Sequence, residues 1–516
     1  MKRDWRQLAD KTFDLLVCGG GVYGAWTAYD AALRGLKVAL IDQGDWAGAT
    51  SSASSKLVHG GLRYLETYDF RLVKKALSER QMLLEAAPHR VWPLRFGVPV
   101  YADSRVGRLM LEAGLFLYDF LAGFPGYSMS HHRFGRNDFS RRFSILESNG
   151  LKGGFTYSDA QTDDARLVLE IVDGAMSQGA ACVNYCRMES LIEQDGKAIG
   201  AILHDCVEDA DCKVYAKQIV NATGCWMSQE EGTRCRLTKG VHLVMPETGL
   251  TEALLLTAKS DGRVFFVIPW YGRTLLGTTD TDYRGNLGRV KVETEDIAYL
   301  LAEANRYLNT GWNADDVIGS FAGLRTLIYS EVAAPSAASR DWKLETAKNG
   351  VHYSVGGKLT SAREDAARIV DAVCTQLGMQ ASCATRGKPF PWVPAQEVAA
   401  LQARARQLGV DEECTFWLIR RHGRRVENLF PAIETNPALA GRIVPDLPFT
   451  HADLLLCARD EMVVHLDDLL RRRLPLLILS RLGEKELRQM AERVAPVLGW
   501  DQARIARETS NCVSGK

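Results

Sequence analysis

The stretch FDLLVCGGGVYG (residues 13–24) decides the fold at the start of the chain. An apolar run typical of a buried strand leads into three glycines, and a helix-like segment follows. The next apolar run, VALI (38–41), ends on Asp42. This order is the G-x-G-x-x-G pattern of dinucleotide-binding βαβ units, with an acidic residue about 20 positions on.

Each defining residue of this pattern has a physical role. Gly19 allows the tight turn, Gly21 lets backbone amides approach a pyrophosphate, and Gly24 lets the helix pack on the sheet. The helix N-terminus attracts phosphates, and Asp42 is placed to accept hydrogen bonds from a ribose. We therefore predict a bound dinucleotide.

The next segment, TSSASSKLVHGGLRY (50–64), is rich in small and hydroxyl side chains. Such residues can line a phosphate chain and let the backbone lie against a flat ring. A flexible serine linker is the alternative, but Lys56, His59, Arg63 and two adjacent glycines interrupt the run.

Further motifs follow along the chain. They are YSD (157–159), DDARL (163–167), VNATG (220–224), KGVH (239–242), IPW (268–270), GTTD (277–280), GLR (323–325), SRD (339–341) and GGKLT (356–360). Together with the two N-terminal segments, they resemble the FAD-dependent, quinone-linked glycerol-3-phosphate dehydrogenase family. The resemblance is strong over about residues 12–370 and looser in RHGRR (421–425) and DEMVVHLDDLLRRR (460–473).

The resemblance implies an α/β fold: an FAD-binding Rossmann-like domain of the D-amino-acid-oxidase and glutathione-reductase type, an antiparallel-sheet substrate domain and a C-terminal helical domain. The strand-like run 219–224 should end at the cofactor, and runs 264–268 and 274–277 suggest antiparallel strands. The expected divisions are a cofactor domain of residues 1–85, 155–235 and 318–390, a substrate domain of 86–154 and 236–317, and a helical domain of 391–516.

The resemblance also implies which residues bind FAD. They are Gly19, Gly21, Gly24, Asp42, Thr50, Ser51, Ser52, Lys56, Leu57, His59, Gly60, Gly61, Ala222, Thr223, Gly224, Gly356, Gly357, Leu359 and Thr360. The GGKLT segment precedes a helix-like run, which would direct a helix N-terminus at the flavin edge where negative charge gathers on reduction.

Glycerol 3-phosphate is a dianion, so its pocket should hold several arginines. By resemblance, Arg325 belongs to the catalytic group, and Arg63 and Arg340 bind substrate. Tyr64 either shapes the same pocket or packs against its apolar neighbours. Lys358 stabilises the reduced flavin, binds a substrate oxygen, or does both.

His242 is the residue we expect to accept the C2 hydroxyl proton, because a neutral imidazole has a pKa near the operating pH. The chain has ten histidines, and His242 is distinguished by the KGVH motif. A structural histidine is the alternative. His59 is the other contender, and its place beside the flavin segment favours contact with the ring system.

Composition excludes several classes of protein. Lysine plus arginine equals aspartate plus glutamate at 63 each in 516 residues, so no global field attracts nucleic acid. The twelve cysteines are scattered without metal-ligand spacing, which indicates free cytosolic thiols and no metal site. We find no signal peptide and no apolar run of the ~20 residues that span a bilayer. We expect a cytoplasmic protein.

Two segments leave room for peripheral contact with the inner face of the cytoplasmic membrane, where a quinone would be the electron acceptor. Residues 105–124 carry an apolar helical stripe, and three arginines precede LPLLIL at 474–479. Helices that face the protein core are the favoured interpretation of both. Oxygen as acceptor and a homodimer are left open.

Four positions depart from the family pattern. Thr326 follows Arg325 where proline is usual, Ser361 and Ala362 replace threonine and tyrosine, and Tyr23 replaces a smaller side chain. These departures leave two alternatives open: a relative that oxidises another small phosphorylated or acidic alcohol or amine, and a non-catalytic FAD-binding redox sensor.

Overall fold

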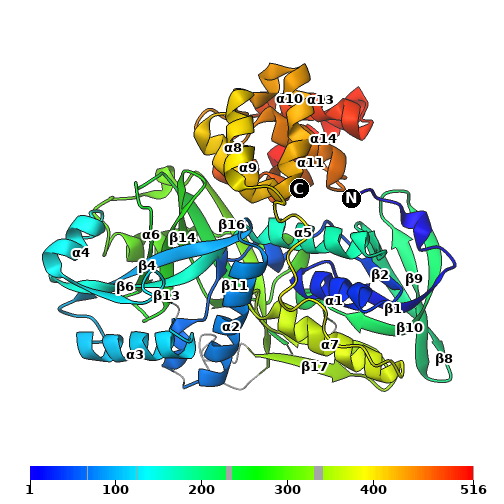
Figure 1. Cartoon of the computed structure of the whole chain (residues 1–516), viewed down its shortest axis with the longest axis horizontal. Helices are drawn as coiled ribbons and strands as arrows, with labels where there is room; N and C mark the ends of the chain where they lie inside the picture. Colours follow the sequence, from blue (N-terminus) through cyan, green and yellow to red (C-terminus); the bar gives the residue numbers. More distant parts are fainter. Residues whose placement is uncertain (67, 125, 228–234, 330–340, 515–516) are drawn as a thin grey trace.

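The computed structural model describes residues 1–66, 68–124, 126–227, 235–329 and 341–514. Two large sheets lie side by side, and a lobe of C-terminal helices sits above both (Figure 1). The α/β fold, the second, largely antiparallel sheet and the C-terminal helical domain are as the sequence predicts.

The first sheet contains the N-terminal strands. Its order is β17-β18-β10-β1-β2-β7, with β9 beside β10 and β8 beside β9. The pairs β1–β10, β1–β2, β2–β7 and β10–β18 are parallel. The strands are β1 (Thr12–Cys18), β2 (Val38–Ile41), β7 (Ala181–Val183), β8 (Cys186–Gln194), β9 (Lys197–Asp205), β10 (Ala210–Asn221), β17 (Trp342–Thr346) and β18 (His352–Gly356).

Three helices cover this sheet. Helix α1 (Val22–Leu33) packs against α5 (Asp164–Ser177) and α7 (Ala362–Gln376). β2 is buried at each of its residues, as its unbroken apolar run predicts, because Val38 and Leu40 pack with the helices while Ala39 and Ile41 pack with residues of β8, β9 and β10.

The second sheet has the order β15-β11-β14-β13-β12-β4-β6-β3, with β16 beside β11 and β5 beside β6. Its pairs are antiparallel, apart from β4 with β12. The strands are β3 (Leu57–Val58), β4 (Val91–Tyr101), β5 (His132–Gly135), β6 (Leu151–Thr162), β11 (Cys235–Met245), β12 (Ala253–Thr257), β13 (Val264–Trp270), β14 (Arg273–Gly277), β15 (Thr281–Asp282) and β16 (Gly319–Ile328). Its helices are α2 (Phe70–Ala86), α3 (Arg108–Leu121), α4 (Arg136–Arg142) and α6 (Thr294–Ala304).

Three strands depart from the predicted domain boundaries. Strands β3, most of β6 and β16 fall in segments expected in the cofactor domain, yet they pair within the second sheet. Long ladders explain this: β6 pairs with β4 from Val91 to Tyr101, and β16 pairs with β11 along its whole length. At these strands the chain crosses from one sheet to the other, so both sheets border the space between them.

The C-terminal lobe is helical, as expected for residues 391–516. Its helices are α8 (Val398–Gln407), α9 (Glu412–His422), α10 (Phe430–Thr435), α11 (His451–Asp460), α12 (Leu476–Leu479), α13 (Glu484–Leu498) and α14 (Gln502–Ser514). Local caps fix two of the starts: the Asp411 side chain accepts from the Cys414 N–H before α9, and Thr450 and Asp453 form a capping box at α11.

The surface differs from expectation at α3. The helix packs inward through Leu115 and Tyr118, and the Tyr118 hydroxyl bonds to Asp159. Leu109 and Phe120, members of the predicted apolar stripe, are instead 82% and 58% exposed. The core-facing interpretation of this stripe is therefore wrong, because the buried side of the helix is a different one.

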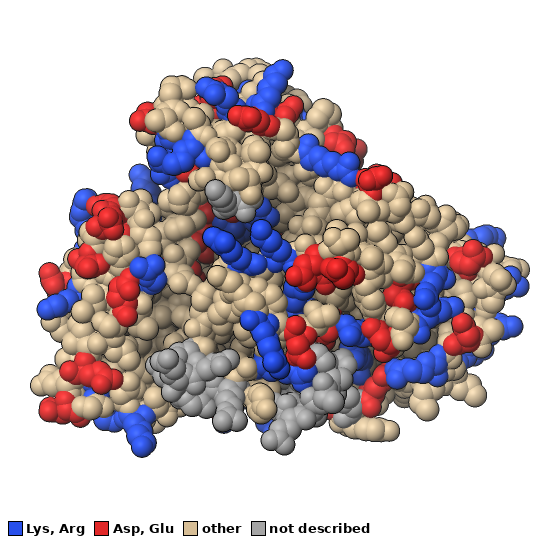
Figure 2. Space-filling view, turned by 180° about the vertical axis from the view of Figure 1, so that it is seen from behind, with Lys and Arg blue, Asp and Glu red and all other residues tan. Residues whose placement is uncertain are grey.

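The second candidate segment behaves as the favoured interpretation predicts. Arg472 and Arg473 are buried, as are Leu474 and most of the apolar run that follows. No helix among the described residues is long and apolar enough to cross a membrane. Basic and acidic side chains are interspersed over the face shown in Figure 2, in keeping with their equal numbers.

Candidate active site

The glycine-rich turn between β1 and α1 borders a cavity of about 940 Å³. Gly19 has φ +109°, and a Cβ there would lie 2.5 Å from the Ala222 carbonyl oxygen. A Cβ on Gly24 would lie 1.7 Å from the Gly19 carbonyl oxygen, so only glycine lets α1 pack this close. The Val22 N–H donates to Ser51 Oγ at 2.9 Å. The N-terminus of α1 thus lines the cavity, where it can attract phosphates.

Asp42 lies directly after β2 on the same cavity. Its carboxylate accepts the N–H groups of Gly20 at 2.5 Å and Gly44 at 2.8 Å. Burial raises the pKa of Asp42 to about 6, because removal from water disfavours the charged form more than these two bonds favour it. The acid therefore lies where the fingerprint requires it, and its bond to a ribose stays a prediction.

Most residues predicted to bind the cofactor line this one cavity, although they come from distant segments. They are Gly19, Gly21, Asp42, Thr50, Ser51, Leu57, His59, Gly61, Ala222, Thr223, Gly224, Gly356, Gly357, Leu359 and Thr360. A Cβ on Gly21 would lie 3.1 Å from Ser51 Oγ, so glycine keeps this part of the cavity open. Backbone amides, hydroxyls and a carboxylate are the groups that bind the phosphates and ribose of a dinucleotide, and the donor set fits one.

Besides Gly24, whose place is in the packing of α1 on the first sheet, three predicted cofactor residues lie off the cavity wall. Lys56 is buried, and its Nζ donates to Asp164 Oδ1 and to the Ser52 carbonyl oxygen, both at 2.6 Å. Ser52 itself donates to a backbone carbonyl. A Cβ on Gly60 would lie 2.4 Å from the Tyr118 hydroxyl oxygen. These residues anchor the hydroxyl-rich segment to neighbouring parts of the protein. The composition of the segment does not distinguish residues with this structural role from residues that bind the cofactor directly.

Strands β11 and β16 bring His242 and Arg325 to the same cavity. Their antiparallel register places both side chains on one face of the sheet. The guanidinium donates to Thr278 Oγ1 at 3.0 Å and pairs with Asp280 at 3.2 Å. A Cβ on Gly240 would lie 2.5 Å from this guanidinium, so the glycine of the KGVH motif makes room for Arg325.

His242 is 2% exposed, and its ring stacks on Phe321 with centroids 4.9 Å apart. Its Nε2 lies 2.8 Å from Ser55 Oγ. Burial, followed by the positive charges of Arg325 and Lys56, lowers the pKa of His242 well below its usual value. The expectation of a pKa near neutrality is thus corrected, and the imidazole is neutral at physiological pH.

Lys358 lies on the turn between β18 and α7, and Tyr23 supports that turn. The Lys358 N–H donates to Tyr23 Oη at 3.0 Å, and the tyrosine donates to Asp365 at 2.9 Å. A Cβ on Gly357 would lie 1.8 Å from the same Oη. The Lys358 Nζ lies 3.8 Å from the centre of the Tyr64 ring, which places Tyr64 beside the cation as well as on the cavity wall.

Arg63 also lines the cavity, whereas Arg340 lies outside the described residues, so its role stays a prediction. Asp280 and Arg472 are among the cavity residues that the sequence reasoning did not propose. Asp280 belongs to the GTTD motif, and its place in one of the motifs that carry the family resemblance was the available signal. Arg472 comes from the C-terminal lobe and lies in the DEMVVHLDDLLRRR segment, whose looser family resemblance implied no contact with a cofactor.

Comparisons with known proteins cover nearly the whole chain. Residues 14–363 match the FAD dependent oxidoreductase family, and residues 388–505 match the C-terminal domain of alpha-glycerophosphate oxidase. The glycerol-3-phosphate dehydrogenase of Synechocystis sp. is 34% identical over 98% of this chain and 96% of its own. The aerobic enzyme of Bacillus subtilis is 36% identical over 84% and 82%.

The chain belongs to the glycerol-3-phosphate dehydrogenase family of FAD-dependent oxidoreductases. The resemblance carried by the sequence motifs is confirmed, and FAD is the dinucleotide that the cavity accommodates. A structure of glycerol-3-phosphate dehydrogenase from Bacillus halodurans complexed with FAD superimposes with a TM-score of 0.80. It is 29% identical and covers 98% of this chain and 95% of its own.

Two of the departures from the glycerol-3-phosphate dehydrogenase pattern, Tyr23 and Ser361, are physically linked. Tyr23 and Ser361 both donate to Asp365 Oδ2, each at 2.9 Å. Ala362 begins α7 and is buried, and Thr326 lines the cavity beside Arg325. The larger Tyr23 therefore supports the Lys358 turn, and it shares the Asp365 carboxylate with Ser361.

Proposed function

We propose that this protein oxidises sn-glycerol 3-phosphate to dihydroxyacetone phosphate with FAD as hydride acceptor, and that the electrons pass to a membrane quinone. The observation that carries the proposal is the convergence of Arg63, His242, Arg325 and Lys358 on the cavity that the glycine-rich turn borders. Cationic side chains suit a phosphorylated substrate, because charge-assisted bonds to phosphate are short and strong.

The arginines bind and orient the substrate in this proposal. Arg325 is held by Thr278 and Asp280 on one side, so its planar fork is fixed before the substrate arrives. Arg63 and Lys358 contribute further positive charge to the same cavity. A dianion bound here would offset the charge of Arg325, which is one of the causes of the low His242 pKa.

His242 takes the proton of the C2 hydroxyl as the alcohol becomes a ketone. In the tautomer with hydrogen on Nδ1, the lone pair of Nε2 is the acceptor, and this atom lies 2.8 Å from Ser55 Oγ on the cavity wall. FAD, when bound, supplies the hydride acceptor and passes the electrons onward. The neutral state that burial imposes on His242 is the state a proton acceptor needs.

The exposed apolar face of α3 supports the membrane part of the proposal. Leu109, Met110, Phe116 and Phe120 are all more than half exposed on one helix at the edge of the molecule (Figure 1). An apolar patch of this kind on an amphipathic helix suits insertion into the headgroup region of a bilayer. We propose that this face docks on the inner surface of the cytoplasmic membrane, where a quinone is the acceptor.

The test is anaerobic. The purified FAD-loaded protein is mixed with sn-glycerol 3-phosphate while the flavin absorbance near ~450 nm is followed. Saturable bleaching is expected. A flavin that dithionite reduces but glycerol 3-phosphate does not would overturn the substrate assignment.

Two variants locate the site. Arg325→Ala should abolish bleaching by substrate while FAD stays bound, because the guanidinium serves the substrate end of the cavity. Arg142→Ala removes an exposed arginine that pairs with Glu252 and should bleach like the wild type. Loss of FAD from Arg325→Ala, or equal impairment of both variants, would contradict the role given to Arg325.

A further inference from the structure

The loop that follows Asp42 is held from two sides. On one side the Ala47 N–H donates to the Gly20 carbonyl oxygen at 3.1 Å, which ties the loop to the glycine-rich turn. The Gly44 carbonyl oxygen accepts the Tyr185 N–H at 2.8 Å. The other side of residues 43–48 is covered by a segment of the C-terminal lobe, residues 461–473, which follows α11.

Two arginines of that segment converge on Asp45. The Arg472 Nε donates to Asp45 Oδ2 at 2.6 Å, and Arg473 Nη2 donates to Asp45 Oδ1 at 2.9 Å. All three side chains are buried. Burial by itself would raise the pKa of Asp45, but Arg473 and Arg472 hold it below its usual value. The carboxylate is therefore ionised, and two arginines of the C-terminal lobe, Arg472 and Arg473, compensate its charge.

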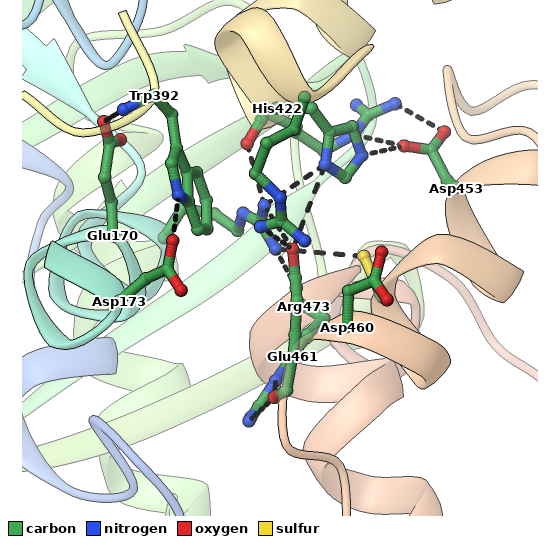
Figure 3. Close-up of polar contacts among 12 residues, drawn as sticks. Glu170, Asp173, Trp392, His422, Asp453, Asp460, Glu461 and Arg473 are labelled. Carbon is green, nitrogen blue, oxygen red and sulfur yellow. Dashed lines mark hydrogen bonds and ion pairs between the residues drawn. The ribbon is translucent and has the colours of Figure 1, made fainter. Parts of the chain in front are cut away.

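The same arginines are fixed within their own lobe. Arg473 Nη2 also donates to the Glu461 carbonyl oxygen at 2.7 Å, and Figure 3 shows the two residues side by side. Arg472 Nη2 donates to Asp468 Oδ1 at 2.7 Å. Each guanidinium group bonds both to Asp45 and to a residue of its own lobe. The position of the lobe therefore fixes the position of the Asp45 loop.

Neutral contacts complete this interface. The Trp46 indole N–H lies 3.3 Å from Met462 Sδ, and the Asn184 amide donates to Asp45 and to the Met462 carbonyl oxygen, both at 3.1 Å. A Cβ on Gly20 would lie 2.3 Å from the Trp46 ring, so the indole packs directly against the glycine-rich turn. The lobe, the loop and the turn are thus in continuous contact.

Arg472 itself lines the cofactor cavity, together with Asp42, Asp45 and Tyr185. We propose that residues 461–473 of the C-terminal lobe are a positioning element of the FAD site: through Arg472 and Arg473 they fix the loop beside Asp42, so that FAD binding and docking of this segment stabilise each other. The reciprocity follows from linkage between two equilibria that share one element. The inference concerns FAD retention and is independent of the substrate.

The test measures the FAD dissociation constant of the apo-protein by quenching of flavin fluorescence on reconstitution. Asp45→Asn and Arg472→Gln should each raise the dissociation constant by about tenfold or more, the scale of coupling within one buried network. Arg472→Lys keeps the charge without the fork and should fall between them and the wild type.

The matched control is Arg421→Gln. Arg421 is equally buried in the C-terminal lobe, but its side chain pairs with Asp453 and does not contact the Asp45 loop. It should lower the free energy of unfolding while leaving the FAD dissociation constant unchanged. Wild-type affinity in Asp45→Asn and Arg472→Gln, or an equal loss of affinity in Arg421→Gln, would overturn the proposal.

A measurement on the wild type covers the case in which the variants do not fold. Amide hydrogen exchange is compared between the apo-protein and the FAD-loaded protein. FAD should slow exchange in residues 461–473 more than in residues 412–435, which form α9 and α10 away from the loop. Equal protection of both segments, or none in residues 461–473, would refute the coupling.

Discussion

Replacing Asp42 by asparagine should increasingly favour the folded apo-protein over that of the wild type as the pH rises from about 4 to about 8. Burial raises the pKa of Asp42 from 3.8 to about 6. At 1.36 kcal/mol per pKa unit, this corresponds to roughly 3 kcal/mol of unfolding free energy. The folded protein holds this proton more tightly than the unfolded chain does, so the wild type loses the corresponding stability as the pH rises through about 6.

Asparagine, like the protonated acid, carries no charge. Its single oxygen acceptor serves only one of the two N–H groups of Gly20 and Gly44, a cost that does not change with pH. Compared with the difference below about pH 4, Asp42→Asn should therefore gain up to roughly 3 kcal/mol on the wild type by about pH 8. Urea unfolding of the apo-proteins, followed by tryptophan fluorescence across this range, measures the difference. Asp138→Asn, at an exposed ion pair with Arg141, serves as the control for the loss of a carboxylate.

The same substitution should act in the opposite direction on the cofactor. Asp42 lines the cavity at the end of the fingerprint, so losing a carboxylate acceptor should weaken FAD binding by about tenfold or more. A stability difference that is constant with pH, or a wild type that gains on the variant as the pH rises, would refute the assignment of a buried, proton-binding Asp42.

Three further outcomes are expected. His242→Asn should slow flavin reduction by substrate by ~100-fold or more with FAD still bound, and a stopped-flow rate equal to that of the wild type would exclude His242 as the proton acceptor. Gly240→Ala places a Cβ 2.5 Å from the Arg325 guanidinium, so KM for glycerol 3-phosphate should rise by about tenfold, and steady-state kinetics with an unchanged KM would contradict the contact. Phe116→Glu with Phe120→Glu should prevent co-sedimentation with lipid vesicles without changing activity toward a soluble acceptor, and vesicle binding as strong as before would exclude the α3 face.

The cofactor end of the cavity could be predicted from the sequence because its determinants are local. The strand, the glycine turn and Asp42 lie within one βαβ unit, and Gly19 and Gly24 occupy positions that no other residue could take. The prediction of cavity-lining residues was less accurate in the hydroxyl-rich segment. Lys56 and Gly60 lie among cavity residues in sequence, but contacts with distant helices turn them away from the cavity.

The residues at the reactive end of the cavity could be predicted only from the family motifs, because no local sequence pattern brings them together. His242 and Arg325 meet because β11 pairs with β16, a contact between strands far apart in the chain. The depressed pKa of His242 could not be foreseen, because it arises from burial and from the nearby charges of Arg325 and Lys56. Arg472 was missed for the same reason: its partners are Asp45 and Asp468, and nothing in its own neighbourhood of the sequence indicates a cofactor.

The interleaving of the first sheet has a consequence for how the protein is made. β1 is flanked by β2 and β10, and β18 joins β10 only after most of the second sheet has been translated. The last contribution to the cavity, Arg472, emerges from the ribosome later still. Nascent or prematurely terminated chains therefore carry the fingerprint without the complete set of residues that line the FAD cavity.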